Sequence, residues 1–308
     1  MLGPLLLRAS RSEGVRGAVS VAPMSRNLID RFVPGEQMSD VLDATDDLVS
    51  SGRAVTIDHL GEDTLDRAQA SATRDTYVRL LGRLADLGLA SRTEVSLKLS
   101  AVGQALPADG HAVALDNARA ICAAASSAGT TVTLDMENHT TVDSTLAVLG
   151  DLRADFPWVG AVLQSCLRRT EGDLRDLSHA GSRVRLVKGA YAEPASVAYA
   201  AKRDVDLAYV RGLKLLMAGA GYPMVASHDP RMIAIARDLA ERYDRTADTY
   251  EFQMLYGIRV PEQRRLVAEG ETMRVYVPYG EDWYGYFMRR LAERPANVAF
   301  FLRSLVSR

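Results

Sequence analysis

The chain has 308 residues, of which 47% are hydrophobic and 25% are charged. These values exclude disordered and fibrous proteins, and the length suits one large domain or two smaller ones. The formal net charge of −2 gives no basic footprint, so we expect no nucleic acid partner. Cys122 and Cys166 form no CxxC or Cys/His pattern, so we expect a reducing compartment and neither a disulfide framework nor a metal site.

The first fifty residues are predicted to form a helical extension in front of the main domain. Met1–Arg26 carries four arginines against the single acid Glu13, which superficially resembles a targeting sequence. Its apolar run Leu5–Leu7 is too short for the core of a secretory signal. Asp40–Ser50 has the apolar spacing of a short amphipathic helix that ends at Gly52. We therefore divide the chain into an extension, residues 1–50, and a main domain, residues 51–308.

From residue 54 onward, short apolar runs rich in β-branched residues alternate with amphipathic segments. The runs have the length of buried strands, and the apolar residues of the segments recur three or four positions apart, as on one helix face. The expected strands are Ala54–His59, Glu94–Ser100, Thr131–Glu137, Val159–Ser165, Arg183–Lys188, Met224–His228, Tyr250–Leu255 and Arg274–Val277. The expected helices are Leu65–Leu87, His111–Ala128, Thr145–Asp155, Val197–Ala218, Ile233–Tyr243, Glu262–Glu269 and Glu281–Glu293.

This alternation predicts an α/β fold with a parallel sheet, because parallel neighbours need a long crossover between them. Eight units in about 250 residues favour a (β/α)8 TIM barrel over an open doubly wound sheet. The open sheet is the weaker alternative because no GxGxxG follows an expected strand. The glycine cluster Gly219–Gly221 precedes a strand and is interpreted as the end of a helix.

Polar side chains alternate with apolar ones in strands whose inward face should be apolar. Charges removed from water cost several kcal/mol each unless partners or a ligand compensate them. Lys98, Asp135 and Arg185 come from three different strands and predict a polar site at the barrel mouth. An internal ion-pair network is one alternative, and a Schiff-base lyase that uses Lys98 or Lys188 is a competing enzyme class.

The last expected helix of the barrel, Glu281–Glu293, is rich in aromatic residues and arginine. Arg289 and Arg290 diverge by about 100° on a helix, so both can bind one small anion only above the ridge between them. The planar guanidinium fork suits a carboxylate. The alternative is a pair of solvated surface arginines, with Arg289 paired to Glu293.

Three segments together resemble the proline dehydrogenase family. They are Arg-Leu-Val-Lys-Gly-Ala-Tyr at residues 185–191, Leu-Tyr-Gly at 255–257, and Tyr286 through Arg289-Arg290 to Glu293. The resemblance runs from about Ala54 to the C-terminus and is strongest to the short bacterial members with a single activity. It implies a distorted (β/α)8 barrel with its last helix over the mouth. It also implies FAD-dependent oxidation of L-proline to Δ1-pyrroline-5-carboxylate, the first step of proline degradation to glutamate.

The resemblance also implies a role for individual residues. It makes Asp135 and Arg185 catalytic, with Arg185 near the flavin N5 atom. The residues that would bind the substrate carboxylate are Lys98, Arg289 and Arg290. The residues that would surround its ring are Tyr276, Tyr286 and Leu255. The expected FAD contacts are Met136, Gln164, Lys188, Gly189, Ala190, Ser227 and His228.

Two segments depart from the family pattern. Ser227-His228-Asp229 stands where the family commonly has Thr-His-Asn, which keeps a hydroxyl but adds an acid near the expected FAD phosphates. Leu-Asp-Met-Glu-Asn at residues 134–138 replaces the commoner Asp-Ala-Glu, which affects the expected contact of Met136.

The chemistry implied by the resemblance is hydride transfer from the proline ring carbon next to nitrogen to flavin N5. Electrons then pass to a membrane quinone, so we expect a cytoplasmic protein with peripheral contact at the inner face of the cell membrane. Phe300–Val306 is a candidate for that contact, and packing of this segment against the barrel is the favoured alternative. Hydroxyproline is the second substrate considered, and bulky Tyr276 favours proline over it. A non-catalytic scaffold with purely structural charges is the remaining alternative.

Overall fold

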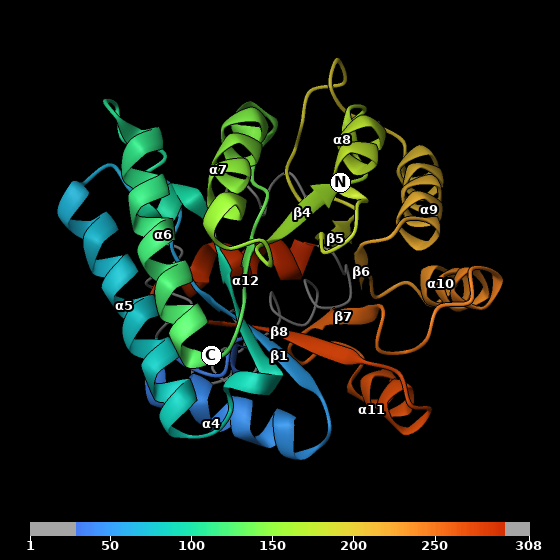
Figure 1. Ribbon diagram of the computed structural model, residues 1–308, viewed down its shortest axis with the longest axis horizontal. Coiled ribbons are helices and arrows are strands. Elements are labelled where there is room, and N and C mark those ends of the chain that lie inside the picture. The colour runs from blue at the N-terminus through green and yellow to red at the C-terminus, as the bar shows by residue number, and fades with distance from the viewer. Residues whose placement is uncertain (1–28, 293–308) are drawn as a thin grey trace, which may run out of the picture.

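A closed barrel of eight parallel strands lies at the centre of the computed structural model, which describes residues 29–292 of the chain (Figure 1). Neighbouring strands in the barrel are consecutive in sequence, and β8 pairs with β1 to close it. The strands are β1 (Ala54–His59), β2 (Thr93–Leu97), β3 (Val132–Leu134), β4 (Gly160–Gln164), β5 (Arg183–Val187), β6 (Tyr222–Ala226), β7 (Glu251–Leu255) and β8 (Met273–Tyr279). The predicted (β/α)8 barrel is confirmed.

A ring of helices surrounds the strands (Figure 1). The α-helices are α4 (Met38–Ser50), α5 (Arg67–Asp86), α6 (Gly110–Ala128), α7 (Val142–Asp155), α8 (Thr170–Leu177), α9 (Lys202–Ala218), α10 (Pro230–Arg242), α11 (Val260–Ala268) and α12 (Trp283–Ala292). Short 3-10 helices are η1 (Ala90–Arg92), η2 (Leu99–Val102) and η3 (His139–Thr141). Within residues 29–292, no helix combines the length and apolar content needed to cross a bilayer.

Helix α4 occupies the position beside β1 and β8 where the helix that follows β8 would be expected, and α12 lies elsewhere. Helix α4 packs against β1 and β8, and its Val41 and Leu48 belong to the same hydrophobic core as the strands. Helix α12 instead lies across the barrel (Figure 1), where Phe287 packs with Phe32 in a second apolar cluster. Residues 38–50, which we expected to precede the barrel as an extension, thus cover its side, and α12 is left to cover its mouth.

The elements differ from the prediction in two ways that matter for the mouth. Helix α8 is absent from the prediction because its sequence is polar and only Thr170 and Leu174 are buried. Strands β2 and β3 end earlier than expected, at Leu97 and Leu134. Lys98 therefore follows its strand, and so does the segment from residue 135 to 137. The polar side chains of Lys98, Asp135 and Glu137 therefore lie at the carboxyl ends of the strands, at the barrel mouth.

Candidate active site

The carboxyl ends of the strands surround a cavity of about 410 Å³. In a TIM barrel, active sites form at this end of the strands, from the loops that follow them. Every residue to which the sequence analysis assigns a role lines this cavity: Lys98, Asp135, Met136, Gln164, Arg185, Lys188, Gly189, Ala190, Ser227, His228, Leu255, Tyr276, Tyr286, Arg289 and Arg290. The structure thus brings together side chains that are up to 192 positions apart in the sequence.

Lys98 is buried at the end of β2 and forms an ion pair with Asp58 of β1, whose carboxylate lies 2.5 Å from the lysine Nζ. Burial alone would lower the pKa of Lys98, but Asp58 and Asp135 outweigh it and raise that pKa above its usual value. A Schiff-base nucleophile must be a neutral amine. The held charge therefore disfavours the lyase alternative at Lys98 and suits a binding site for an anion.

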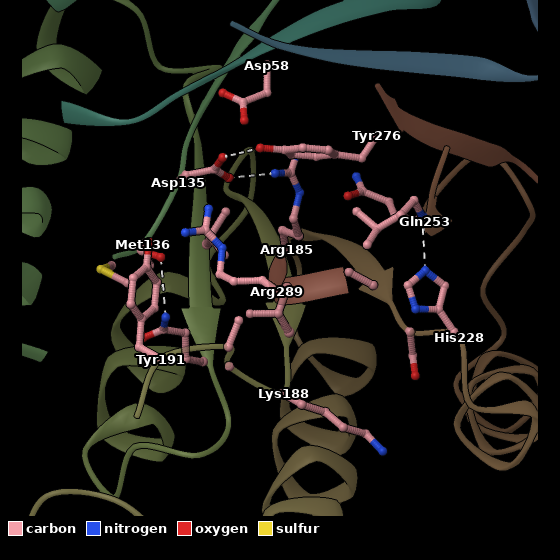
Figure 2. Close-up of a pocket in the computed structure, with 18 of the residues that line it drawn as sticks. Asp58, Asp135, Met136, Arg185, Lys188, Tyr191, His228, Gln253, Tyr276 and Arg289 are labelled. Carbon is pink, nitrogen blue, oxygen red and sulfur yellow. Dashed lines mark hydrogen bonds and ion pairs between the residues drawn. The ribbon is translucent and has the colours of Figure 1, made fainter. Parts of the chain in front are cut away.

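Asp135, Arg185 and Tyr276 form a hydrogen-bonded group (Figure 2). One oxygen of Asp135 accepts from Arg185 Nη1 at 2.8 Å, and the other accepts from the Tyr276 hydroxyl at 2.8 Å. The Arg185 guanidinium also lies over the Tyr276 ring, 5.4 Å from its centre. Burial and the nearby Asp135 raise the pKa of Tyr276, so its hydroxyl stays a donor. Asp135 thus fixes the orientation of both neighbours.

Helix α12 brings Tyr286, Arg289 and Arg290 to the cavity. Arg289 Nη2 pairs with Glu62 at 2.7 Å, and the Arg290 guanidinium lies 5.4 Å from the centre of the Tyr286 ring. Glu293, the partner considered in the sequence analysis, lies outside the described residues. Because both arginines line the cavity, the alternative of two solvated surface arginines is wrong.

Below the cavity, near the amino ends of the strands, a second set of charges fills the barrel. Glu94 accepts from Arg183 at 2.7 Å and from Arg185 at 3.2 Å, and Glu251 accepts from Arg274 at 2.8 Å. We call Glu94, Glu251, Arg183 and Arg274 the lower network. Burial tends to raise the pKa of Glu94, but the three arginines outweigh it and lower that pKa to about 2.

Lys188, which directly follows β5, contacts two acids, Asp206 and Asp229. Lys188 Nζ lies 2.5 Å from Asp206 and 3.1 Å from Asp229, and its side chain extends away from the Asp135–Arg185 pair (Figure 2). Asp229 caps α10 by accepting the Arg231 backbone N–H at 3.1 Å and forms an ion pair with the Arg231 side chain. The acid that departs from the family pattern is therefore neutralised by two cations.

His228 has a defined tautomer. Its Nε2 accepts the backbone N–H of Leu255 at 3.0 Å, so that nitrogen carries no proton (Figure 2). Its carbonyl oxygen accepts from Arg259 Nη1 at 2.7 Å. These two contacts connect the segment after β6 to the end of β7 and to Arg259, just before α11.

The cavity wall fits a flavin. Gly189 has φ +104°, and a Cβ atom there would lie 2.3 Å from the Cys166 sulfur, so only glycine fits at this turn of the wall. Gln164 donates to the carbonyls of Met136 and Glu137, which leaves its own buried oxygen without a partner. The isoalloxazine ring offers an imide N–H for such an acceptor. The wall thus offers a buried acceptor at Gln164 that suits the imide edge of the ring.

Glu137, directly behind this wall, is a buried carboxyl with few partners. It accepts from the backbone N–H of Ser100 at 3.2 Å and from the Ser100 hydroxyl at 2.6 Å. Burial raises its pKa to about 7, against the smaller opposing effects of Ser100 and Lys98. The same Ser100 hydroxyl accepts the backbone N–H of Asp63, next to Glu62. Glu137 therefore anchors the loop that carries the partner of Arg289.

Nine further residues line the cavity without a role in the sequence analysis. Asp58 is in principle visible in the sequence, since it alternates with Ile57 as the polar residues of β2 alternate with their neighbours. Glu62 and Tyr191 lie in loops, where no periodicity points to them. The nine are Asp58, Glu62, Val162, Val187, Tyr191, Ala226, Asp229, Gln253 and Met254.

The fold and the cavity together define a class of protein: a (β/α)8 barrel whose mouth is a cavity lined by cations and aromatic rings. The comparisons narrow the class. A family model described as "Proline dehydrogenase" matches residues 41–303, and the chain belongs to the proline dehydrogenase family.

Curated proline dehydrogenases align with this chain along nearly their whole length. The chain is 42% identical to a proline dehydrogenase of Deinococcus radiodurans over 91% of this chain and 90% of that protein. It is 39% identical to proline dehydrogenase 1 of Bacillus subtilis over 90% of each. The recognition from motifs is therefore confirmed.

Among solved structures, the barrel is similar to proline utilization A from Bdellovibrio bacteriovorus inactivated by N-propargylglycine. The two match with a TM-score of 0.81 and 26% identity, over 92% of this chain and 34% of the other. Proline utilization A from Bradyrhizobium japonicum matches at a TM-score of 0.74 and 22% identity, over 92% of this chain and 32% of that one. This chain spans about a third of each of these longer chains, and the match supports the fold.

Proposed function

We propose that the protein oxidises L-proline to Δ1-pyrroline-5-carboxylate with bound FAD, as the first step of proline degradation to glutamate. One observation carries the proposal: three cations, Lys98, Arg289 and Arg290, line the same cavity as the aromatic rings of Tyr276 and Tyr286. This combination suits a small ring that bears a carboxylate. Membership of the proline dehydrogenase family supports the same substrate.

In this proposal, the three cations bind the carboxylate of proline. Guanidinium groups can form two parallel hydrogen bonds to a carboxylate, and each charge-assisted bond contributes roughly 1.5–3 kcal/mol. Lys98 stays protonated because Asp58 accompanies it, so its charge is available over the working pH range. Tyr276, Tyr286 and Leu255 then enclose the ring and exclude water from it.

FAD would be held by Met136, Gln164, Lys188, Gly189, Ala190, Ser227 and His228, all of which line the cavity. When bound, FAD supplies an acceptor at N5 for the hydride of the proline ring carbon next to nitrogen. Arg185 would stabilise negative charge beside it, and Asp135 keeps Arg185 and Tyr276 in place through the two 2.8 Å hydrogen bonds. Asp135 and Arg185 are therefore the catalytic residues of the proposal.

The protein must also select the protonation state of the substrate. The amine of proline has to lose its proton before hydride can leave the neighbouring carbon, so activity rises with pH. The carboxylate clamp, which consists of Lys98, Arg289 and Arg290, would fix the ring in one orientation and so reduce the entropic cost of presenting the reacting carbon to its acceptor.

For the acceptor of the electrons, we propose a membrane quinone, reached by peripheral contact at the inner face of the cell membrane. The contact candidate named in the sequence analysis, Phe300–Val306, lies outside the described residues. Reduction of a quinone by enzyme and proline in lipid vesicles, with no reduction by enzyme in the absence of proline, is the expected result.

The test of the main proposal is optical. Purified protein should be yellow, and its flavin absorbance should bleach anaerobically when L-proline is added. Arg185→Met should retain the yellow colour but bleach much more slowly, since it removes a charge that favours the reduced flavin. A colourless protein that borohydride traps with a carbonyl substrate would instead support a Schiff-base lyase and contradict the proposal.

A further inference from the structure

A groove of about 690 Å³ lies between helices α4 and α11, outside the catalytic cavity. It is lined by the end of α4, the first turns of α11 and the loop after β7. Its charged residues include four arginines and the two acids Asp30 and Asp47. None of these residues has a role in the proposed reaction, so the groove requires a separate explanation.

Arg53 is the unusual member of this groove, because it is only 6% exposed. A guanidinium carries five N–H donors. Arg53 uses two of them, to the Ser51 hydroxyl at 2.9 Å and to the Gln263 side-chain oxygen at 3.0 Å. Burial lowers the pKa of Arg53, and the neighbouring Arg264 lowers it further. The remaining donors have no partner among the described residues, and the residue lines the groove.

Arg245 provides an internal comparison. It also lies beside a surface cavity and also has no carboxylate within 4.0 Å among the described residues. However, it donates five hydrogen bonds to backbone carbonyl oxygens, at 2.6–3.1 Å. An arginine that only stabilises the fold can thus satisfy all its donors internally. Arg53 does not, which indicates that an acceptor from outside the chain belongs there.

Two more arginines in the groove lack an ion pair. Neither Arg31 nor Arg264 has a carboxylate oxygen within 4.0 Å in the described part of the chain, although Asp30 and Asp47 line the same groove. The fourth arginine, Arg259, has Glu262 at 3.7 Å. Arg31, Arg53 and Arg264 thus come from three separate segments and line one groove without an ion pair, although the Arg31 guanidinium also lies over the Phe32 ring, 5.7 Å from its centre. Several guanidiniums around one space are a common arrangement for phosphate recognition.

We propose that the groove between α4 and α11 binds a phosphomonoester, with its phosphate on Arg53 and with Arg31 and Arg264 completing the site. Three guanidiniums can divide the terminal oxygens of a phosphate, whereas a carboxylate offers only two oxygens. The volume exceeds the needs of a bare phosphate. Tyr256, Leu48 and Pro261 provide apolar surface for the rest of the ligand.

The groove shares one loop with the catalytic cavity. Gln263, which accepts from Arg53, donates to the backbone carbonyls of Leu255 at 3.2 Å and Ile258 at 2.8 Å. Leu255 lines the catalytic cavity, while Tyr256 lines the groove. A ligand that fixes Arg53 therefore also stabilises the loop from residue 255 to 258.

The test is a calorimetric titration of the full-length, FAD-loaded protein with phenyl phosphate and with inorganic phosphate at matched ionic strength. Saturable binding is expected, tighter for phenyl phosphate. Arg264 is exposed, so Arg264→Gln should leave the fold intact. This substitution should weaken phosphate binding about tenfold or more. Arg242→Gln, an exposed arginine of α10 outside the groove, is the matched control and should bind as the wild type does.

A second measurement locates the ligand. Adding phenyl phosphate should slow the amide hydrogen exchange of residues 47–53 and 255–264. The exchange rates of residues 216–221 should remain unchanged. Arg289→Met should retain the binding, because it alters only the catalytic cavity. The proposal fails if the wild type gives no saturable heat, if Arg264→Gln binds as tightly as the wild type, or if Arg289→Met abolishes binding.

Discussion

The two levels of the barrel interior treat buried charge in different ways. In the lower network, Glu94 of β2 accepts from Arg183 of β5, and Glu251 of β7 accepts from Arg274 of the neighbouring β8. No member of the network lines the catalytic cavity. At the mouth, Lys98, Arg289 and Arg290 line an open cavity. Arg185 joins the two levels, with Glu94 on one side and Asp135 on the other. Buried charge by itself therefore does not identify a site; buried charge that faces a cavity does.

Two buried carboxyl groups make the same contrast. Three arginines surround Glu94 and hold its pKa at about 2, so it stays ionised. Glu137 accepts hydrogen bonds from Ser100, and burial raises its pKa to about 7. The same residue type is thus a fixed charge at one level and a titrating group at the other.

The largest effect is expected in the lower network. Glu94→Gln leaves Arg183 and Arg185 without their shared carboxylate and should lower the free energy of unfolding by about 3–5 kcal/mol. Urea unfolding at neutral pH measures it. Glu241→Gln, at an exposed position on α10, serves as the control and should change stability by less than about 0.5 kcal/mol. A loss below about 1 kcal/mol for Glu94→Gln would show that the network is not structural.

The second effect is a pH dependence from Glu137. Because folding raises its pKa from 4.5 to about 7, the folded state binds this proton more tightly than the unfolded state. Its contribution is present below pH 4.5 and is lost as the pH rises through 7, by about 2–3 kcal/mol. Unfolding curves from pH 5 to 8 should show this loss in the wild type and a smaller one in Glu137→Gln. Parallel curves for the two proteins would contradict the shift.

A third effect separates binding from stability at the mouth. Arg289→Met should raise the KM for proline by about 10- to 100-fold, the equivalent of one lost charge-assisted bond, while FAD stays bound. Its melting temperature should change little, because the pair with Glu62 is partly exposed. Steady-state kinetics and flavin content measure both. An unchanged KM would remove Arg289 from the carboxylate clamp.

The smallest effect concerns Tyr276. Tyr276→Phe keeps the ring over Arg185 but removes the hydrogen bond to Asp135, so kcat/KM should fall about tenfold. Arg185 retains its bonds to Glu94 and Asp135, and the variant should therefore fold normally. A loss of flavin in this variant would mean that Tyr276 supports the cofactor rather than the substrate.

Periodicity in the sequence predicted the eight strands and most helices, because each buries an apolar face of regular spacing. It missed α8, where only Thr170 and Leu174 are buried. Polar alternation pointed to Lys98 and Asp135, but it could not separate a site from an internal ion-pair network, since both use the same kinds of residue. The structure shows an ion-pair network at one level of the barrel and a cavity lined by charged residues at the other.

The pairing of loop residues could not be predicted. Glu62 meets Arg289 across 227 positions of sequence, in a loop without periodicity. The unpartnered donors of Arg53 are likewise a property of the packed structure, because an arginine beside a strand gives no sign of how many hydrogen bonds it will make. The resemblance to the family, in contrast, gave every role that the sequence analysis assigns to a cavity residue. It could do so because it compares sequence segments and does not require knowledge of which loops meet in space.

The most direct test of the central claim compares L-proline with L-prolinamide, which has the same ring but no carboxylate, in anaerobic bleaching of the flavin. The wild type should be reduced at least about 100-fold more efficiently by L-proline, and Arg289→Met should lose most of this preference. Equal reduction of the wild type by both compounds would contradict a cavity built around a carboxylate.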